Sequence, residues 1–309
     1  MAEIAKSDAN AELFREPRQL DGSRPYVVRI SGYDFVKFKQ GLRQPYDAVF
    51  QYAMVLTMND LVTCFQAITG YTHQFDIILV FDKNRSTVAQ SPVRTLTAYT
   101  SYATVRFNHH MAEQIQSEFH VGSYLPSKYQ QVMTKQTIFY ATFFQAIDAG
   151  TTEASIFDEK LVLLKYLVDR CRHIALHRSL QQWTSTLLGP DSVNQYKSTE
   201  DMVHALASTR RIRWQLDVPL FMSYGVFGKI DVMPKSQHHP TTRRVSNRAL
   251  ILDDSDHSVQ WMFAPHWPIL KRHMDTSVVT PQMIFDVRPF VDSPSSDSSS
   301  SPNLKPASV

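Results

Sequence analysis

The alternation of short apolar strands with long amphipathic helices most constrains what this chain can fold into. Residues 26–30 predict a strand in which Val28 and Ile30 lie on one face and Val27 on the other. A helix is expected to begin near Asp47, a residue type suited to capping a helix N-terminus. Its apolar positions recur at helical spacing and are Phe50, Met54, Met58, Leu61, Val62 and Phe65.

The same alternation continues along the chain. Residues 71–81 predict a strand or hairpin that bends near Gln74, and residues 94–117 predict a second long helix. A further strand is expected at residues 154–157. It precedes a third helix, whose apolar positions are Leu161, Leu164, Val168, Cys171 and Ala175. This order favours an α+β fold in which long helices pack on an antiparallel, ferredoxin-like sheet.

The amino-acid composition is that of an ordinary globular protein, and it indicates in which cellular compartment the protein is expected. Of the 309 residues, 43% are hydrophobic and 20% are charged, and the formal net charge of +3 permits nucleic-acid binding without requiring it. Cys64 and Cys171 are too few for a disulfide framework, which favours a reducing compartment. The sequence has no run of about 18 apolar residues and no leader in which an apolar core follows basic residues. We therefore expect an intracellular, cytoplasmic protein that does not enter a membrane.

Seven short strings occur in a fixed order within residues 25–230. They are RISGYDFVKF (29–38), QPYDAVFQYAM (44–54), GYTHQFDIILVF (70–81), YATVRFN (102–108), YLVDR (166–170), KSTEDM (197–202) and RIRWQLDVPLFMSYGVF (211–227). Together they resemble motifs of the tRNA-histidine guanylyltransferase family. The resemblance implies a polymerase-like palm that adds a guanosine to the 5′ end of tRNA-histidine in the 3′-to-5′ direction. In that family two aspartates on adjacent strands hold two Mg²⁺ ions, which align the triphosphate and the attacking group.

This chain departs from the family at both metal-binding positions. Ser31 stands at the first aspartate position and Phe75 at the second, and neither carries the carboxylate that Mg²⁺ prefers. Gly32, whose family counterpart offers a backbone carbonyl, is kept. Asp76 occupies the neighbouring glutamate position, but strand side chains alternate faces, so it should not simply replace the residue at 75. The alternative is a rebuilt metal site made from Asp34 and Asp76.

Most of the family's phosphate-contacting cations are also replaced. Gln44 stands at a lysine position, and Val49 and Ser91 stand at arginine positions. Glu153 reverses the charge at another arginine position, while Arg94 keeps a positive charge near a lysine position and is the remaining candidate for nucleotide binding. These losses imply that triphosphate binding has been abandoned, so no cofactor is expected. Mg²⁺ with GTP or ATP would be used only if the metal site has been rebuilt.

The chain is expected to fall into five segments. Residues 1–24 form a flexible N-terminal arm, residues 25–158 the palm-like domain, and residues 159–232 a helical C-terminal region. Residues 233–291 form a variable extension. The serine-rich tail at residues 292–309 has too little apolar surface to offset its ordering entropy and is expected to be disordered.

Two basic strings, residues 209–214 and 241–248, are candidates for contact with RNA phosphates. Their arginines are Arg210, Arg211 and Arg213 in the first string and Arg243, Arg244 and Arg248 in the second. Trp214 would be available to stack on a base. The second string lies in a polar stretch, residues 235–248, that reads as an exposed loop. The alternatives are that these arginines form ordinary solvated surface and that Trp214 belongs to the core.

We therefore hypothesise a diverged, catalytically inactive relative of the family that binds tRNA, another RNA or a protein partner, and that forms homo-oligomers by analogy with the family. One alternative is an active nucleotidyltransferase of the tRNA guanylyltransferase type with a rebuilt Mg²⁺ site. The other is a scaffolding subunit that kept the family's assembly interface but does not bind RNA.

Overall fold

A computed structural model of the 309-residue chain describes part of it in detail. The described residues are 23–39, 41–82, 92–118, 129–130, 136–145, 156–196, 198–232, 243–252, 256–264 and 276–285. The expected tail at residues 292–309 and all but the last two residues of the expected arm lie outside these segments.

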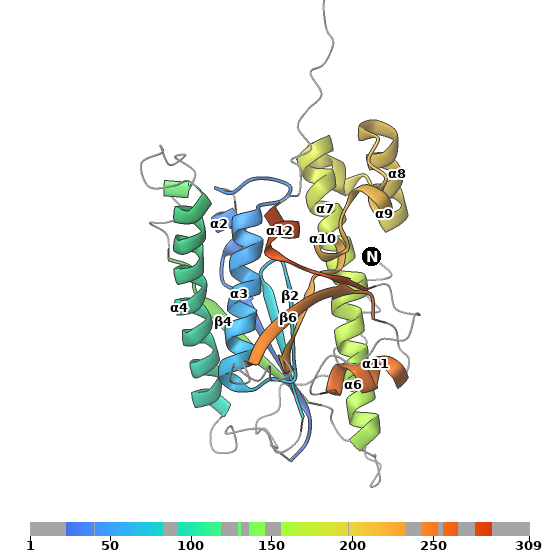
Figure 1. The fold of residues 1–309 in the computed structure, drawn as a ribbon. Helices are drawn as coiled ribbons and strands as arrows, with labels where there is room; N and C mark the ends of the chain where they lie inside the picture. The colour runs from blue at the N-terminus through green and yellow to red at the C-terminus, as the bar shows by residue number, and fades with distance from the viewer. Residues whose placement is uncertain are drawn as a thin grey trace, which may run out of the picture.

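An antiparallel sheet forms the centre of the protein (Figure 1). Within the described residues the strand order is β4-β1-β3-β2-β5-β6-β7, and neighbouring strands pair in antiparallel fashion. The strands are β1 (Tyr26–Gly32), β2 (Thr69–His73), β3 (Asp76–Phe81), β4 (Phe139–Gln145), β5 (Val226–Val232), β6 (Arg243–Leu250) and β7 (Thr276–Val278). The predicted α+β fold with an antiparallel sheet is confirmed.

Two long helices, α3 (Ala48–Phe65) and α4 (Pro92–Glu118), run side by side over one face of the sheet (Figure 1). The short helices α2 (Phe35–Lys39) and α12 (Pro281–Phe285) lie beside them. Asp47 caps α3 as predicted, since its Oδ1 accepts a hydrogen bond from the Phe50 amide at 2.9 Å. The apolar stripe of α3 is buried in one core with the even-numbered residues of β1, which are Tyr26, Val28 and Ile30.

A second layer covers the opposite face. It contains α6 (Ile156–Val168), the π-helical segment η1 (Asp169–Ile174) and α7 (Ala175–Leu188), which continue one another, together with α11 (Asp256–Phe263). Val27 of β1 and Ile78 and Val80 of β3 point to this side and join a second core with α6 and α11. Strands β1 and β3 are therefore buried on both faces, which explains their nearly continuous apolar sequence.

The helical region after α7 consists of η2 (Pro190–Asn194), α8 (Thr199–Arg210), α9 (Trp214–Asp217) and α10 (Leu220–Tyr224). Ser198 and Asp201 cap α8 through reciprocal hydrogen bonds between side chain and backbone. The chain then enters β5, which pairs with β2, and β6 and β7 extend the sheet outward. Residues of the expected variable extension thus share the central sheet.

Two predicted elements are wrong in type or place. Residues 156 and 157, expected to end a strand, begin α6, and the strand of this region is β4, earlier in the chain. The stretch 235–248, expected to be an exposed loop, contains most of β6. Backbone hydrogen bonds with β5 hold β6 in the sheet. The loop prediction relied on the absence of apolar side chains, which backbone pairing does not require.

Among the residues that the structure describes, one helix, α3, is long and apolar enough to cross a membrane by length and composition alone, with a mean hydropathy of 1.2 over 18 residues. However, 56% of it is buried inside the protein, as expected for the core helix of a globular fold.

Lys229 of β5 is fully buried and attaches α11 to the sheet. Its ammonium donates hydrogen bonds to Thr69 Oγ1 at 2.6 Å and to the carbonyl oxygens of Met262 at 3.0 Å and Ala264 at 2.8 Å. It also lies 4.9 Å from the ring centroid of Trp261. These bonds provide the ammonium with acceptors that burial would otherwise deny it.

Candidate functional site

Ser31 and Asp76 face each other across β1 and β3, at the place where the family resemblance puts the metal ions. Both side chains are buried, and Ser31 Oγ donates a hydrogen bond to Asp76 Oδ1 at 2.5 Å. The tight connection between β2 and β3 produces this register, because Gln74 adopts a left-handed conformation (φ 51°) and the Gly32 amide donates to the Phe75 carbonyl. Asp76 therefore shares a face of the sheet with Ser31, and Phe75 does not.

Two arginines engage the Asp76 carboxylate. Arg29 Nη2 lies 3.2 and 3.3 Å from its two oxygens, and Arg178 Nη1, from α7, lies 2.8 Å from Oδ2. Burial raises the pKa of Asp76, but Arg29, Arg178 and the Ser31 hydroxyl oppose this effect and bring the pKa below its usual range. We call Arg29, Ser31, Asp76 and Arg178 the Asp76 cluster. Its carboxylate is ionised at neutral pH.

Phe75 has a structural role beside this cluster. Its ring packs against Phe35, with centroids 6.5 Å apart, and the Arg178 guanidinium lies 5.3 Å from the Phe75 centroid. Gly32 is required for the same packing, since a Cβ at this position would come within 2.1 Å of the Phe35 ring. The Phe75 ring thus packs against a cation at the position that the resemblance assigns to the second metal ligand.

The residues present do not fit a pair of Mg²⁺ ions. The Asp76 oxygens already accept hydrogen bonds from two guanidinium groups and a hydroxyl, and Phe75 offers no ligand atom. Asp34 points elsewhere, because it is exposed and pairs with Lys37 at 2.8 Å. Among the residues that the structure describes, no three His, Cys, Asp or Glu side chains come together as a metal site.

The other positions compared with the family are scattered. Arg94 lies exposed in the first turn of α4, and Val49 is buried in the core beneath α3. Gln44 accepts a hydrogen bond from Gln182 of α7 at 2.9 Å. Ser91 and Glu153 lie outside the described residues.

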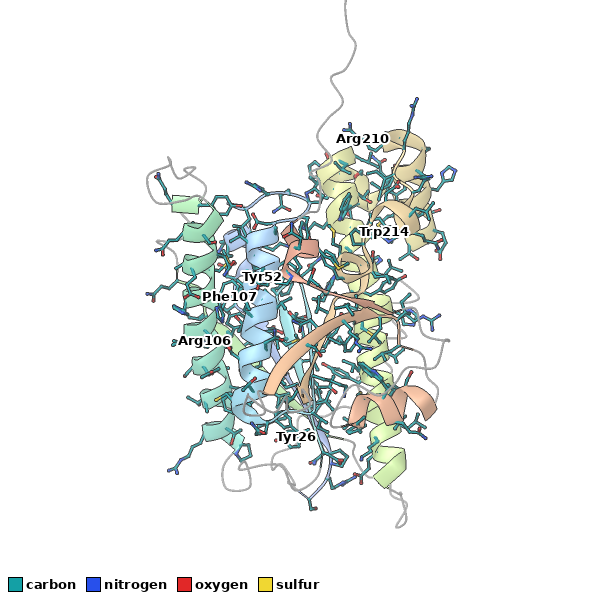
Figure 2. All side chains as sticks on the ribbon, in the orientation of Figure 1. Tyr26, Tyr52, Arg106, Phe107, Arg210 and Trp214 are labelled. Atoms are coloured by element: carbon teal, nitrogen blue, oxygen red, sulfur yellow. The ribbon has the colours of Figure 1, made fainter. Side chains whose placement is uncertain are left out.

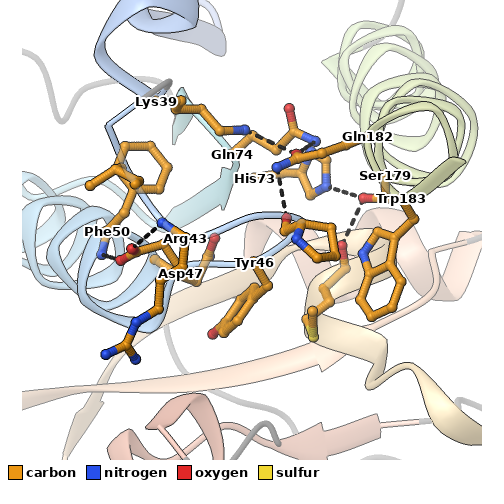
Figure 3. Close-up of a pocket in the computed structure, with 14 residues that line it drawn as sticks. Lys39, Arg43, Tyr46, Asp47, Phe50, His73, Gln74, Ser179, Gln182 and Trp183 are labelled. Carbon is orange, nitrogen blue, oxygen red and sulfur yellow. Dashed lines mark hydrogen bonds between the residues drawn. The ribbon is translucent and has the colours of Figure 1, made fainter. Parts of the chain in front are cut away.

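A small pocket lies between α7, the β2–β3 turn and the chain that enters α3 (Figure 3). Lys39 Nζ donates to Gln182 Oε1 at 2.9 Å, and Gln74 Nε2 donates to the same oxygen at 3.1 Å. The cavity volume is about 40 Å³, whereas pockets for drug-sized ligands measure about 300–1,000 Å³. A nucleotide would therefore enter only after side chains move.

The pocket contains two groups with strongly shifted pKa values. Burial, reinforced by Arg178, lowers the pKa of Lys39 to about 8 and that of His73 to about 3. His73 Nε2 lies 2.9 Å from Ser179 Oγ, which itself donates to the Met222 carbonyl. The Ser179 proton is thereby used, so His73 is the donor in its own bond. The sequence did not predict a role for these residues, because neither Lys39 nor His73 belongs to a recognisable functional motif.

The first basic string lies at the α8–α9 end of the molecule, where Figure 2 labels Arg210 and Trp214. Arg210 donates to the Leu187 carbonyl at 2.6 and 3.0 Å, and Arg213 pairs with Asp217. Arg211, exposed and left-handed (φ 58°), directs its side chain into solvent.

Trp214 is buried and meets Trp183 edge-to-face, with ring centroids 5.7 Å apart. The alternative in which Trp214 belongs to the core is therefore the one observed, and its ring is not available to stack on a base. In the second string, Arg243, Arg244 and Arg248 lie on β6, and the side chains of the first two lie outside what the structure describes.

The two cysteines and one histidine lie in different environments on the helices. Cys64 of α3 is exposed, whereas Cys171 of η1 is buried. His110 of α4 is buried and lies 2.7 Å from Asp60 Oδ2.

An antiparallel sheet with two long helices packed on one face defines a palm-like α+β fold. The sequence model of the family described as tRNAHis guanylyltransferase (Thg1) matches residues 9–164, about half of the chain, so the protein belongs to this family. A curated relative, uncharacterized protein R259 of Acanthamoeba polyphaga mimivirus, is 28% identical over 221 residues, which are 66% of this chain and 69% of the viral protein.

Solved structures of the family share the fold. A bacterial tRNA(His) guanylyltransferase (Thg1)-like protein in complex with GTP has a TM-score of 0.54 at 18% identity, covering 85% of this chain and 99% of that chain. The same kind of protein in complex with ATP gives 0.53 at 19% identity, covering 74% and 86%. The tRNA(His) guanylyltransferase of Saccharomyces cerevisiae gives 0.53 at 14% identity, covering 70% and 90%.

Proposed function

We propose that this protein is an RNA-binding member of the tRNAHis guanylyltransferase family that does not carry out metal-dependent guanylyl transfer. The observation that carries the proposal is the Asp76 cluster. Asp76 is the carboxylate next to the position that the resemblance assigns to the second metal ligand, and it is neutralised by Arg29 and Arg178.

Chemistry supports the loss of transfer. Two-metal phosphoryl transfer relies on ions that stabilise both the attacking and the leaving oxygen. A guanidinium supplies positive charge and hydrogen bonds, but it cannot lower the pKa of an attacking hydroxyl as a coordinated ion does. Ser31 donates a hydrogen bond to Asp76, and Phe75 packs against Arg178, which also binds Asp76. The Asp76 oxygens are therefore occupied by protein groups and are not available to coordinate a metal ion.

RNA binding rests on the family's tRNA substrate and on the exposed cation at the α8–α9 turn. Arg211 is the best candidate of its string, because Arg210 and Arg213 have intramolecular partners. Contact with RNA phosphates releases counterions, so binding should weaken steeply as salt concentration rises.

Filter binding of tRNA and of an unrelated RNA of equal length, between about 50 and 200 mM salt, tests this proposal. Arg211→Gln should weaken binding and reduce the salt slope by about one unit, while melting curves stay unchanged. The matched control is Lys37→Gln, an exposed cation on α2, far from α8 in Figure 1. A parallel assay with labelled GTP, Mg²⁺ and tRNA should give no transfer.

Two outcomes contradict the proposal. Guanylyl transfer above background would restore the alternative of a working metal site. Failure of any RNA to bind at about 50 mM salt would favour the scaffolding subunit.

A further inference from the structure

The Asp76 cluster leaves several hydrogen-bond donors unused. Arg29 binds Asp76 through Nη2 only, and its buried Nε has no hydrogen-bond partner in the described part of the chain. Arg178 binds Asp76 through Nη1 only, and 30% of its side chain is exposed. A buried donor without an acceptor costs free energy, so such an atom requires an acceptor from water or from a ligand.

Charge at the cluster favours an anion. Two guanidinium groups share one carboxylate, which leaves an excess positive charge. Arg170 of η1 adds a third cation nearby, since its guanidinium lies 5.5 Å from the ring centroid of Tyr166. Burial raises the pKa of Tyr166, and Arg170 and Arg29 both oppose this rise. Asp169, half-buried beside Arg170 and His173, offsets part of this charge at the outer edge.

The two departures from the family's metal ligands support the same arginines. Ser31 donates to Asp76, which fixes the carboxylate between the guanidinium groups. The Phe75 ring lies beneath the Arg178 guanidinium and limits its orientations. Compared with an aspartate at position 75, Phe75 carries no negative charge, and its ring packs against the positively charged Arg178 guanidinium.

We propose that Arg29 and Arg178 form a phosphate-binding site that works without a divalent cation, at the place where relatives hold their metal ions. Guanidinium groups bind phosphate oxygens through paired N–H donors. Such binding does not require a metal ion. The ligand is a phosphate group, from a nucleotide or from a phosphorylated RNA end. This site rests on the proposed function only in assuming that Asp76 binds no metal.

Calorimetry in EDTA at low salt, with pyrophosphate and ATP as probes, tests the site directly. Both should bind, and an excess of Mg²⁺ should not strengthen binding. Arg178→Gln should lower the affinity about tenfold or more, as expected for the loss of a charged hydrogen bond. Lys37→Gln, which removes an exposed cation outside the cluster, should leave the affinity unchanged.

Arg178→Lys keeps a cation for Asp76 but removes the paired donors, so it separates phosphate recognition from folding. It should melt close to the wild type and still bind the probes more weakly. Oligonucleotides with a 5′-phosphate or a 5′-hydroxyl distinguish an RNA end from a free nucleotide as the source of the phosphate.

Three results would overturn the site: no binding of any phosphate probe at millimolar concentration, an affinity that requires Mg²⁺, or an affinity that Arg178→Gln and Arg178→Lys leave unchanged. These results are independent of RNA binding, because Arg211→Gln tests RNA binding at the α8–α9 turn, away from the Asp76 cluster.

Discussion

Asp76→Ala should destabilise the protein by about 3 kcal/mol, because it leaves two guanidinium groups without their shared anion. Removing one partner of a buried pair costs about 3–5 kcal/mol. The lower end applies here, since 30% of the Arg178 side chain and 18% of the Arg29 side chain are exposed, so both guanidinium groups regain some water. At about 2–4 °C per kcal/mol, the melting temperature should fall by roughly 6–12 °C.

Urea unfolding followed by circular dichroism measures this cost, with Lys37→Gln as the control. The Asp34–Lys37 pair is exposed, so its removal should change stability by less than about 1 kcal/mol. Equal unfolding midpoints for the two variants would refute the reasoning that the cluster holds α7 against the sheet.

The pH dependence of Asp76→Ala follows from the same group. Burial raises the pKa of Asp76, but Arg29, Arg178 and Ser31 oppose it and leave the pKa below its usual range. A depressed carboxyl pKa contributes stability that is complete above the unfolded value, about 3.9, and is lost as pH falls through the folded value. The difference between wild type and variant should therefore shrink as pH falls below about 4.

Three further outcomes are expected. Restoring both family aspartates with Ser31→Asp and Phe75→Asp should lower stability, since a carboxylate at 75 would replace a ring packed on Phe35, and should give no guanylyl transfer; product from labelled GTP would contradict this. His73, with its pKa lowered to about 3, should remain neutral from pH 7 down to about pH 4, and a titration of its ring in NMR spectra within that interval would show that it is less buried. Trp214→Ala should cost about 3–5 kcal/mol of stability, and a variant that melts normally while losing RNA affinity would place the ring at the surface.

The elements predicted correctly are those whose burial follows from local pattern. The odd and even residues of β1 each enter a different core, as the alternation of Val27, Val28 and Ile30 predicts. Asp47 caps α3 because the capping bond spans only three residues. In both cases the information lies within one element.

Contacts between distant segments escaped prediction. Asp76 and Arg178 are 102 residues apart, and nothing near Arg178 marks it as the partner of a residue on β3. The resemblance assigns Ser31 and Phe75 to the family's ligand positions, but a resemblance between short strings does not show that a cation from α7 reaches them. Similarly, β6 pairs through its backbone, so its arginine-rich sequence suggested a loop.

The π-helical segment η1 sets the rotational phase between α6 and α7. Its hydrogen bonds join residues five apart, as the bond from the Ala175 amide to the Arg170 carbonyl shows, so it holds one residue more than an α-helical turn. Successive residues of an α-helix are rotated by about 100°, so deleting one residue from η1 would turn α7 by about that angle relative to α6. Arg178 would then point away from Asp76. The length of η1, more than any one of its side chains, directs the arginine into the site.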